Sequence, residues 1–446
     1  MSIKVGMVSL GCSKNQVDAE IMLATLKNNG FTLCGEPGLC DVVIINTCGF
    51  IQSAKEEAIE EILEFVSLKN EGKIKVIAVT GCLAQRYQEE ILKEIPEVDI
   101  VLGIGSYDKL VGAINEALTK STVTLDFGCR ENLALNGERV LTTLPFYAYI
   151  KIAEGCDNCC SYCAIPQIRG RFRSRLIEDI LAEARLLAQT GVKELIVIAQ
   201  DTTRYGEDLY GHYALAQLLN ELCTVEGIEW IRILYCYPDK ITDELLTTMQ
   251  SQEKIVKYID IPIQHCNSEI LSAMNRSSNE EEIVALIEKI RSKVPGIIIR
   301  TTLITGFPGE TEEQFAQLDS FVKRVKFDRL GCFAYSAEEN TVAGEMPNQI
   351  DEEVKARRAQ VIMESQAVIM EQKNEVLIGS EIKVIVEGYD KYGSCYFGRS
   401  YADAPDIDGK IFFTDELTHT MGDFVNVKIT QVVDYDLIGH GLSCVN

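Results

Sequence analysis

The nine residues from Gly155 to Cys163 read Gly-Cys-Asp-Asn-Cys-Cys-Ser-Tyr-Cys, and no other segment restricts the architecture as strongly. In this loop Cys156, Cys160 and Cys163 are separated by three and then two residues. Three thiolates from one loop can bind three irons of a 4Fe-4S cluster and leave the fourth iron without a protein ligand. An open metal position is where a substrate or cofactor binds, as in catalytic zinc sites. The spacing therefore predicts a catalytic iron-sulfur loop.

Cys159 gives the same loop a second interpretation. With it, the four cysteines form two abutting Cys-x-x-Cys pairs, which suit a zinc knot. Zinc ribbons usually separate their pairs by a long spacer, because four ligands must surround the metal tetrahedrally. The abutting pairs favour the iron-sulfur interpretation and leave zinc as the alternative.

Short apolar segments alternate with amphipathic segments around this loop, which directly follows the first of them. Such alternation indicates a parallel sheet, and six strand-helix units predict a partial (β/α) barrel, smaller than the eight-stranded form. A long charged helix is expected from Asp351 to about Asn374. The six expected strands are residues 147–152, 194–199, 230–235, 257–261, 297–303 and 330–335.

The N-terminal part of the chain shows the same alternation and predicts a doubly wound parallel α/β unit. Cys12, Cys48 and Cys82 each lie just beyond an expected strand and beside a glycine. Because the carboxyl ends of parallel strands share one edge, the three thiolates can converge and bind a second cluster. The alternative is that they are ordinary core cysteines. A capping box beginning at Ser53 predicts the start of the second helix. The expected strands are Lys4 to Leu10, Asp41 to Asn46, Ile74 to Thr80 and Val98 to Leu102.

Two further segments complete the expected organisation. Residues 121–144 lack a clear hydrophobic period and are interpreted as a linker. After Gly379, short runs of alternating apolar and polar residues are broken by turns, which predicts an all-β barrel of about 70 residues. The expected domains are residues 3–119, 142–373 and 376–446.

Charge restricts the partners that the chain can bind. The formal net charge of −24 disfavours binding to phosphate backbones, which depends on Lys and Arg. From Val376 onward, eleven Asp and Glu residues outnumber five Lys and Arg residues, a net charge of −6. An acidic barrel suits a basic protein and argues against direct RNA binding, with a merely solvated acidic face as the alternative. Without a bilayer-length apolar run or a signal-peptide pattern, a cytoplasmic location away from membranes is expected.

The cysteine loop resembles that of the radical S-adenosylmethionine superfamily, in which an aromatic residue precedes the last cysteine, as Tyr162 does here. The resemblance implies that the open iron binds S-adenosylmethionine. One electron then splits this cofactor and yields a radical that abstracts hydrogen from an unactivated carbon. The implied cofactor-binding residues are Tyr162, Gln200, Asp201 and Gly306, and no separate catalytic side chain is assigned.

Over essentially its whole length the chain is similar to the methylthiotransferases of that superfamily. Its C-terminal barrel resembles the one called TRAM. Residues 10–15, 48–51, 398–400 and 403–409 resemble the branch that modifies an aspartate of small-subunit ribosomal protein twelve. The other matching motifs lie at residues 46–50, 81–86, 164–166, 169–170, 173–175, 262–265, 274–276 and 306–311.

This resemblance implies two 4Fe-4S clusters, one on the loop cysteines and an auxiliary one on Cys12, Cys48 and Cys82. In the implied mechanism, one S-adenosylmethionine methylates a sulfur that the auxiliary cluster presents. A second S-adenosylmethionine yields the radical that abstracts hydrogen from the aspartate β-carbon, and the methylthio group is transferred to that carbon. The implied partners are the ribosomal protein, free or on the ribosome, and a reduced flavodoxin- or ferredoxin-type electron donor. The alternatives are a tRNA adenosine methylthiotransferase and a non-catalytic iron-sulfur or zinc protein.

Two weaker features remain open. Four arginines alternate at positions 169, 171, 173 and 175, and they either meet a cofactor carboxylate or a neighbouring domain, or form a solvated strand face. Nine cysteines are assigned to burial or chance: Cys34, Cys40, Cys129, Cys223, Cys236, Cys266, Cys332, Cys395 and Cys444.

Overall fold

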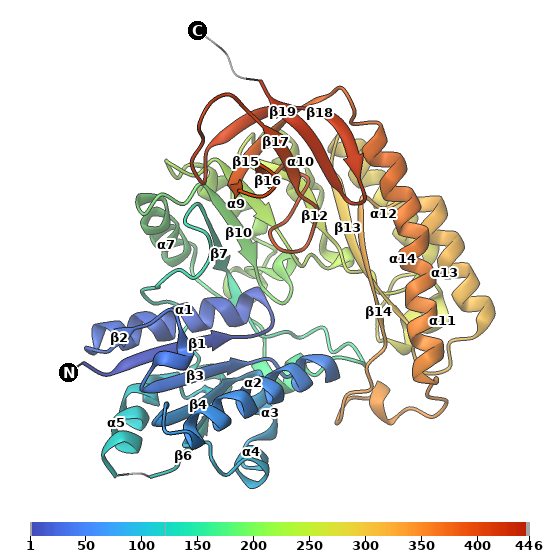
Figure 1. Ribbon diagram of the computed structural model, residues 1–446. Helices are drawn as coiled ribbons and strands as arrows, with labels where there is room; N and C mark the ends of the chain where they lie inside the picture. Colours follow the sequence, from blue (N-terminus) through green and yellow to red (C-terminus); the bar gives the residue numbers. More distant parts are fainter. Residues whose placement is uncertain (1, 121, 443–446) are drawn as a thin grey trace.

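The computed structural model describes residues 2–120 and 122–442. Figure 1 shows an N-terminal unit in blue, a central unit from green to orange and a C-terminal barrel in red. Both outer units pack against the central one, and each unit has its own hydrophobic core. Within the described residues, no helix is long and apolar enough to cross a membrane.

The N-terminal unit consists of β1 Lys4–Ser9, α1 Ser13–Asn28, β2 Thr32–Leu33, β3 Val42–Thr47, α2 Gln52–Asn70, β4 Val76–Gly81, α3 Cys82–Tyr87, α4 Glu90–Glu94, β5 Ile100–Gly105, α5 Leu110–Lys120 and β6 Thr124–Gly128. Its sheet is parallel, in the order β2-β1-β3-β4-β5-β6. Strands β3, β4 and β5 are buried along their whole length, because helices cover both faces. Helices α2 and α3 pack on one face and α1 and α5 on the other, so the unit is doubly wound, as predicted.

Two local expectations for this unit are wrong. The segment interpreted as a linker contains β6, which pairs in parallel with β5. This edge strand is only half buried, so its sequence carries little apolar pattern. Helix α2 begins at Gln52, and among the described residues its N-cap, Ile51, makes no side-chain capping bond. Ser53 therefore lies inside the first turn, and packing of α2 on the sheet decides where the helix begins.

The central unit consists of β7 Tyr147–Lys151, β8 Ala153–Glu154, α6 Ile165–Arg169, β9 Arg173–Ser174, α7 Ile177–Gln189, β10 Glu194–Ile198, α8 Glu207–Tyr210, α9 Leu215–Cys223, β11 Trp230–Ile233, α10 Asp243–Ser251, β12 Ile255–Asp260, α11 Ser268–Ala273, α12 Glu280–Lys293, β13 Ile298–Thr305, α13 Glu312–Val325, β14 Arg329–Ala334 and α14 Glu352–Glu375. Its six-stranded sheet is parallel, in the order β14-β13-β12-β11-β10-β7. This sheet is the predicted partial barrel, and the long helix predicted after it is α14.

The C-terminal unit consists of β15 Glu381–Asp390, β16 Cys395–Arg399, β17 Ile411–Thr414, β18 Phe424–Val433 and β19 Asp436–Gly441. These strands close into a barrel in the order β15-β16-β17-β19-β18, which leaves no sheet edge unpaired. Its interior is filled by apolar side chains such as Val384, Phe413 and Val427. The predicted all-β barrel is therefore present.

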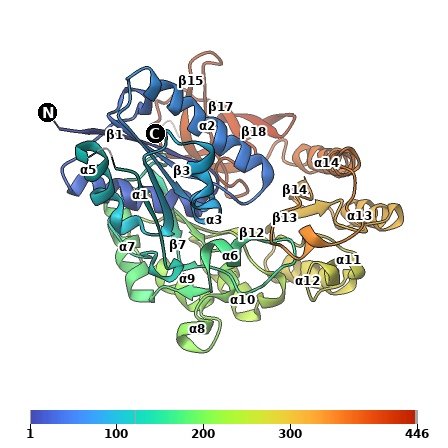
Figure 2. The same cartoon turned by 90° about the horizontal axis from the view of Figure 1, so that it is seen from below.

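The two faces of the central sheet meet different neighbours. Ile150 belongs to the core formed with the surrounding helices, whereas Tyr147 and Tyr149 point to the opposite face. On that face they pack with Val17 of α1 and Ile385 of the barrel. In Figure 2, seen from below, the N-terminal unit lies beside the strands of the central sheet and in front of the barrel. Residues of both outer units therefore pack on this face of the central sheet.

Buried ion pairs fix the barrel to the central sheet. Glu194 on β10 accepts from Arg232 of β11 at 2.8 Å and from Arg399 of β16 at 2.7 Å. Burial raises the pKa of Glu194, but Arg399 and Arg232 outweigh it and hold this pKa below its ordinary value. The carboxylate is therefore ionised at neutral pH and joins one cation from each unit.

Candidate functional site

The loop predicted to bind iron and sulfur follows β8 and is fixed by backbone contacts. Gly155 has a φ of 76°, and a Cβ at this residue would lie 2.1 Å from a backbone carbonyl oxygen, so only glycine fits. The amide of Cys156 donates to the carbonyl of Gly170 at 3.2 Å, and that of Ser161 donates to the carbonyl of Met274 at 3.1 Å. The loop is therefore held at both ends although it has no regular secondary structure.

The three loop thiols lie in one electrostatic neighbourhood. Burial raises the pKa of Cys156 to about 11 and also raises that of Cys163, and the charge of Cys160 adds to both effects. Arg276 faces the thiols, with its Nη1 3.8 Å from the Sγ of Cys160. Metal binding to such thiols releases protons, and the nearby guanidinium favours the resulting negative charge.

Cys159 is arranged differently from its three neighbours. It is exposed, its φ of 49° is left-handed, and its carbonyl accepts from Asn275 Nδ2 at 2.9 Å. In residues 2–120 and 122–442, no three His, Cys, Asp or Glu side chains converge on one metal position. Cys159 therefore differs from the partly buried Cys156, Cys160 and Cys163 both in its exposure and in its backbone conformation.

The structure brings Cys12, Cys48 and Cys82 together at the carboxyl edge of the N-terminal sheet. They follow β1, β3 and β4 respectively. A Cβ on Gly11 would lie 2.9 Å from the Sγ of Cys48, so a glycine is needed where the Cys12 segment passes this thiol. Burial raises the pKa of both Cys48 and Cys82. Charge on Cys12 adds to both effects and charge on Cys48 adds to that on Cys82, as expected for neighbouring sulfurs. These three residues fit a second cluster that leaves one iron open.

Cations and a helix terminus surround this second set of thiols. Surrounding protein atoms raise the pKa of Cys12, but the charges of Lys14 and Arg169 and the amides of Asn15 and Lys14 bring it below its ordinary value. The helix α1 begins directly after Cys12, so its free amides favour a thiolate there. Burial raises the pKa of Cys82 to about 12, partly offset by Arg169.

Four buried charges join the two cysteine sets. Lys151 contacts Asp18 of α1 at 2.5 Å and Glu154 at 2.7 Å, and Arg169 contacts the same carboxylates at 2.9 and 3.0 Å. Arg169 also reaches across the interface, with Nη2 3.5 Å from the Sγ of Cys82. Cys82 packs against α6, the helix that follows the iron-sulfur loop. The two thiol sets therefore face each other across one charge network.

Two predicted cofactor residues follow β10, beside the loop. Gln200 donates Nε2 to Glu154 at 2.6 Å, whereas its Oε1 is buried and has no partner among the described residues. Such an acceptor fits a bound ligand that donates hydrogen bonds, such as an ammonium group. Asp201 is engaged within the protein, because its Oδ2 accepts from Asn158 at 2.9 Å and from Lys240 at 3.1 Å. We infer that Asp201 orients the loop through Asn158.

The other two predicted cofactor residues lie near β13. Tyr162 accepts from Arg276 Nη1 at 3.4 Å and packs against the cluster that contains Phe307. Gly306, next to Phe307, has a φ of 73° and donates its amide to a buried glutamate. A Cβ on Gly306 would lie 2.3 Å from the Cγ of Lys355 on α14, so a side chain is excluded at this point.

Three cations near the thiols were not assigned from the sequence. Arg276 and Lys14 belong to motifs of the resembled family, at residues 274–276 and 10–15, so their positions could have been expected, but Lys240 carries no local signal. Of the alternating arginines, one contacts a neighbouring domain and another is solvated, so each of the two interpretations holds for part of the set. Arg169 is buried and meets the N-terminal unit, whereas the side chain of Arg171 is 82% exposed.

Among the nine cysteines assigned to burial or chance, Cys34 and Cys40 are neighbours whose thiols both contact the carbonyl of Glu36. Cys444 lies outside the described residues. Cys129 is exposed, Cys40, Cys236 and Cys266 are buried, and Cys34, Cys223, Cys332 and Cys395 are intermediate.

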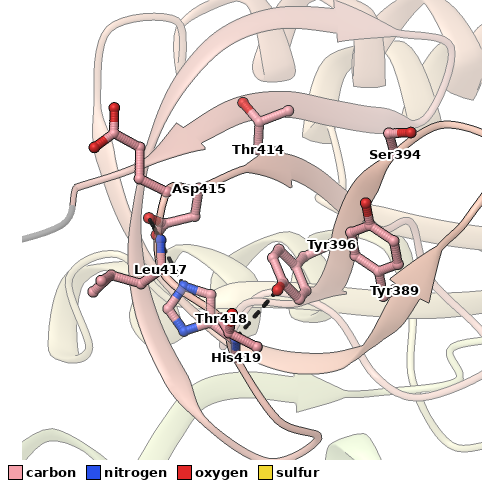
Figure 3. A pocket seen from close by; sticks show the side chains of 9 residues that line it. Tyr389, Ser394, Tyr396, Thr414, Asp415, Leu417, Thr418 and His419 are labelled. Atoms are coloured by element: carbon pink, nitrogen blue, oxygen red, sulfur yellow. Dashed lines mark hydrogen bonds and ion pairs between the residues drawn. The ribbon is translucent and has the colours of Figure 1, made fainter.

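A hollow of about 430 Å³ opens on the C-terminal barrel (Figure 3). His419 lines it, with Nε2 2.9 Å from Oδ2 of Asp415, and its ring contacts the ring of Tyr396. Tyr389 stacks edge-on against Tyr396 at 4.9 Å between ring centroids. None of the predicted site residues lines the hollow, so the chemistry lies elsewhere and the hollow is a surface feature of the barrel.

Comparison with protein families matches all three units. Residues 4–103 match a family described as "Uncharacterized protein family UPF0004", residues 150–322 match the "Radical SAM superfamily" and residues 378–441 match the "TRAM domain". Among curated relatives, three proteins named "Ribosomal protein uS12 methylthiotransferase RimO" cover 98% of this chain and 98% of their own length. Those of Acetivibrio thermocellus and Desulforamulus reducens are 50% identical over 446 and 437 residues, and that of Clostridioides difficile is 48% identical over 441 residues.

Solved structures share the fold at low sequence identity. The radical S-adenosylmethionine methyltransferase TsrM from Kitasatospora setae, with cobalamin and a [4Fe-4S] cluster bound, has a TM-score of 0.58 at 14% identity and covers 77% of each chain. The cobalamin-dependent S-adenosylmethionine radical enzyme OxsB has a TM-score of 0.53 at 13% identity, covering 81% of this chain and 56% of its own. These similarities concern the arrangement of the sheet and helices alone.

Proposed function

The chain belongs to the RimO family of ribosomal protein uS12 methylthiotransferases, and we propose that it transfers a methylthio group to the β-carbon of a uS12 aspartate. Its membership of the radical S-adenosylmethionine superfamily implies a 4Fe-4S cluster and S-adenosylmethionine. The single observation that carries the proposal is the facing arrangement of two cysteine sets, with Arg169 in contact with Cys82 and with the Glu154 that precedes the loop. A substrate carbon placed between them can be reached from both sides.

We assign one 4Fe-4S cluster to Cys156, Cys160 and Cys163 and a second one to Cys12, Cys48 and Cys82. When bound, the first cluster with S-adenosylmethionine supplies a radical that removes hydrogen from the aspartate β-carbon, and the second supplies the sulfur of the methylthio group. The domains proposed for these roles are residues 3–119 for the second cluster, 142–373 for the radical cluster and 376–446 for substrate docking.

The remaining site residues orient the cysteine loop and the bound cofactor. Asn158, braced by Asp201 and Lys240, orients the loop that carries the first thiols. The unpartnered Oε1 of Gln200 is placed to accept from the amino group of S-adenosylmethionine. Gly306 lets the segment after β13, which is proposed to line the cofactor pocket, pass close to Lys355 of α14. Because these supports are packed side chains rather than mobile loops, the pocket is preorganised for one geometry.

The substrate is a basic protein in this proposal, and the acidic barrel supports that choice. Glu416 and Asp415 line the hollow with three aromatic rings, from Tyr389, Tyr396 and His419. Carboxylates beside aromatic faces suit Lys and Arg side chains, whereas they repel phosphates. A reduced flavodoxin- or ferredoxin-type protein is the proposed electron donor, and the cytoplasm is the proposed location because uS12 is assembled into ribosomes there.

The test is anaerobic reconstitution of iron and sulfide, reduction, and addition of S-adenosylmethionine with either uS12 or tRNA. We expect uS12 to gain the mass that corresponds to replacement of one hydrogen by SCH3, located by fragmentation at an aspartate. The same gain on tRNA alone would contradict the substrate but not the chemistry. Absence of 5′-deoxyadenosine with either substrate would contradict the radical reaction itself.

A further inference from the structure

Lys14 reaches from the N-terminal unit, next to Cys12, to the central unit. It is the second residue of α1, two positions after Cys12, and is only 7% exposed. Its Nζ lies 3.1 Å from the centroid of the Tyr235 ring. Tyr235 follows β11 in the central unit, so this cation–π contact crosses the interface between the units.

No carboxylate partners Lys14 within residues 2–120 and 122–442. Neither an ion pair nor a side-chain hydrogen bond joins its ammonium group to any described residue, and the ring of Tyr235 is its one specific contact. The other two buried cations of this interface, Lys151 and Arg169, each contact both Asp18 and Glu154. The charge of Lys14 lowers the pKa of Cys12, but a desolvated ammonium group without a carboxylate partner is still costly, so this position favours binding of a negatively charged group from outside the chain.

Tyr235 is held in an unusual conformation that keeps its ring under Lys14. Its φ is 62°, which is left-handed and costly for a bulky residue. Its amide donates to Asp260 Oδ2 at 3.0 Å, and its carbonyl accepts from the amide and the hydroxyl of Thr202 at 3.0 and 3.1 Å. Three hydrogen bonds therefore maintain a strained backbone whose effect is to place an aromatic face against the ammonium group.

We propose that Lys14 binds the side-chain carboxylate of the substrate aspartate and selects aspartate over its amide analogue. The inference rests on the proposed function. The reacting β-carbon must lie between the two thiol sets, and the carboxylate is attached directly to that carbon. Lys14 lies between Cys12 and the carboxyl end of the central sheet, so it can bind this carboxylate while the β-carbon stays accessible. Arg169 provides a cation at Cys82 and also acts on Cys12, which leaves Lys14 available for the substrate.

The test measures binding without turnover. Reconstituted holoenzyme with S-adenosylmethionine but no reductant is titrated with uS12 and with uS12 whose target aspartate is replaced by asparagine. We expect the wild-type chain to prefer the aspartate form and Lys14→Met to lose at least about 30-fold of this preference, because one partner of a buried charge pair is removed. Lys14→Arg should retain most of it. Lys257→Met, which changes an exposed lysine of β12, is the matched control and should bind both forms as the wild type does.

Iron content and the visible spectrum of each variant separate substrate binding from a structural role. An unchanged preference in Lys14→Met overturns the inference, and so does a lost preference accompanied by lost iron, because Lys14 would then serve the second cluster. If wild-type uS12 gains the methylthio mass while the preference is unchanged in Lys14→Met, the inference alone fails. If wild-type uS12 gains no mass, the proposed function fails and the inference fails with it.

Discussion

The two cysteine sets of this protein differ in how the chain builds them. Cys156, Cys160 and Cys163 lie within one short loop, whereas Cys12, Cys48 and Cys82 come from the ends of three strands. The first set depends on local spacing, and a few backbone bonds hold it. The second exists only when a parallel sheet is complete, because its members are far apart in sequence. A loop can therefore specify a metal site by itself, while a sheet edge specifies one only through the fold.

The largest effect should come from removing one thiol of either set. In Cys163→Ala we expect neither 5′-deoxyadenosine nor methylthiolated uS12, because the radical cluster is lost. Cys48→Ala should still form 5′-deoxyadenosine but yield no methylthiolated product. Mass spectrometry of uS12 and chromatography of the nucleoside measure both outcomes. Cys223→Ala, at a partly buried thiol of α9, serves as the control. Full product from Cys48→Ala would show that the two sets do not have separate roles.

The next largest effect concerns the charge network that joins the two sets. Arg169→Met leaves Asp18 and Glu154 with Lys151 as their only shared cation, so the free energy of unfolding should fall by about 3–5 kcal/mol. Chemical denaturation followed by circular dichroism measures this change. Arg171→Met removes an exposed guanidinium two residues away and should change stability by no more than about 0.5 kcal/mol. Equal effects of the two substitutions would mean that the network does not hold the interface.

A smaller effect is expected at the proposed cofactor pocket, which lies beside the loop cysteines and not beside the cysteines at the sheet edge. Gly306→Ala combines left-handed strain with overlap on Lys355, a cost of about 2–4 kcal/mol, and should raise the KM for S-adenosylmethionine. Gly309 has a similar φ of 82°, but the space around its Cβ position is open. Gly309→Ala should therefore cost only the backbone strain, about 1–2 kcal/mol of folding free energy. Iron content should stay normal in both variants. A normal KM in Gly306→Ala would remove this glycine from the cofactor pocket.

The smallest effect is a pH dependence at the barrel interface, which lies apart from both thiol sets. Arg399 and Arg232 hold the pKa of Glu194 below the ordinary value of 4.5, despite burial, so the folded state favours the ionised carboxylate. Its contribution is fully present above that ordinary value and is lost as pH falls toward the lower folded pKa. The slope from this one group is at most about 1.4 kcal/mol per pH unit.

Denaturation midpoints between pH 7 and 3 measure this slope. Glu194→Gln should be less stable at neutral pH and lack this part of the pH dependence. Glu229→Gln, at an exposed residue of the same unit, should follow the wild-type curve. An identical slope in Glu194→Gln and the wild type would show that another group controls acid stability.

The sequence by itself determined the class of each unit, because hydrophobic periodicity and turn residues are local properties. The loop cysteines and the three strand-end cysteines, which we propose hold the clusters, were also recognised from the sequence, since the spacing of the loop and the position after a strand are both visible in one dimension. The sequence-based prediction is wrong for β6, which it places in a linker, and for the first residue of α2. In both places contacts with the rest of the fold outweigh a weak local signal. An edge strand with few apolar residues forms because β5 offers it hydrogen-bonding partners.

Only the tertiary structure decided which side chains meet across the units. Arg169 and Asp18 are joined, as are Lys14 and Tyr235, although long stretches of chain separate the members of each pair. Such contacts depend on how α1 and the central sheet pack, and packing is set by the summed shapes of many side chains rather than by any local motif. For the same reason the sequence shows that Asp201 follows a strand, but only the fold shows that its carboxylate is occupied by Asn158 and Lys240.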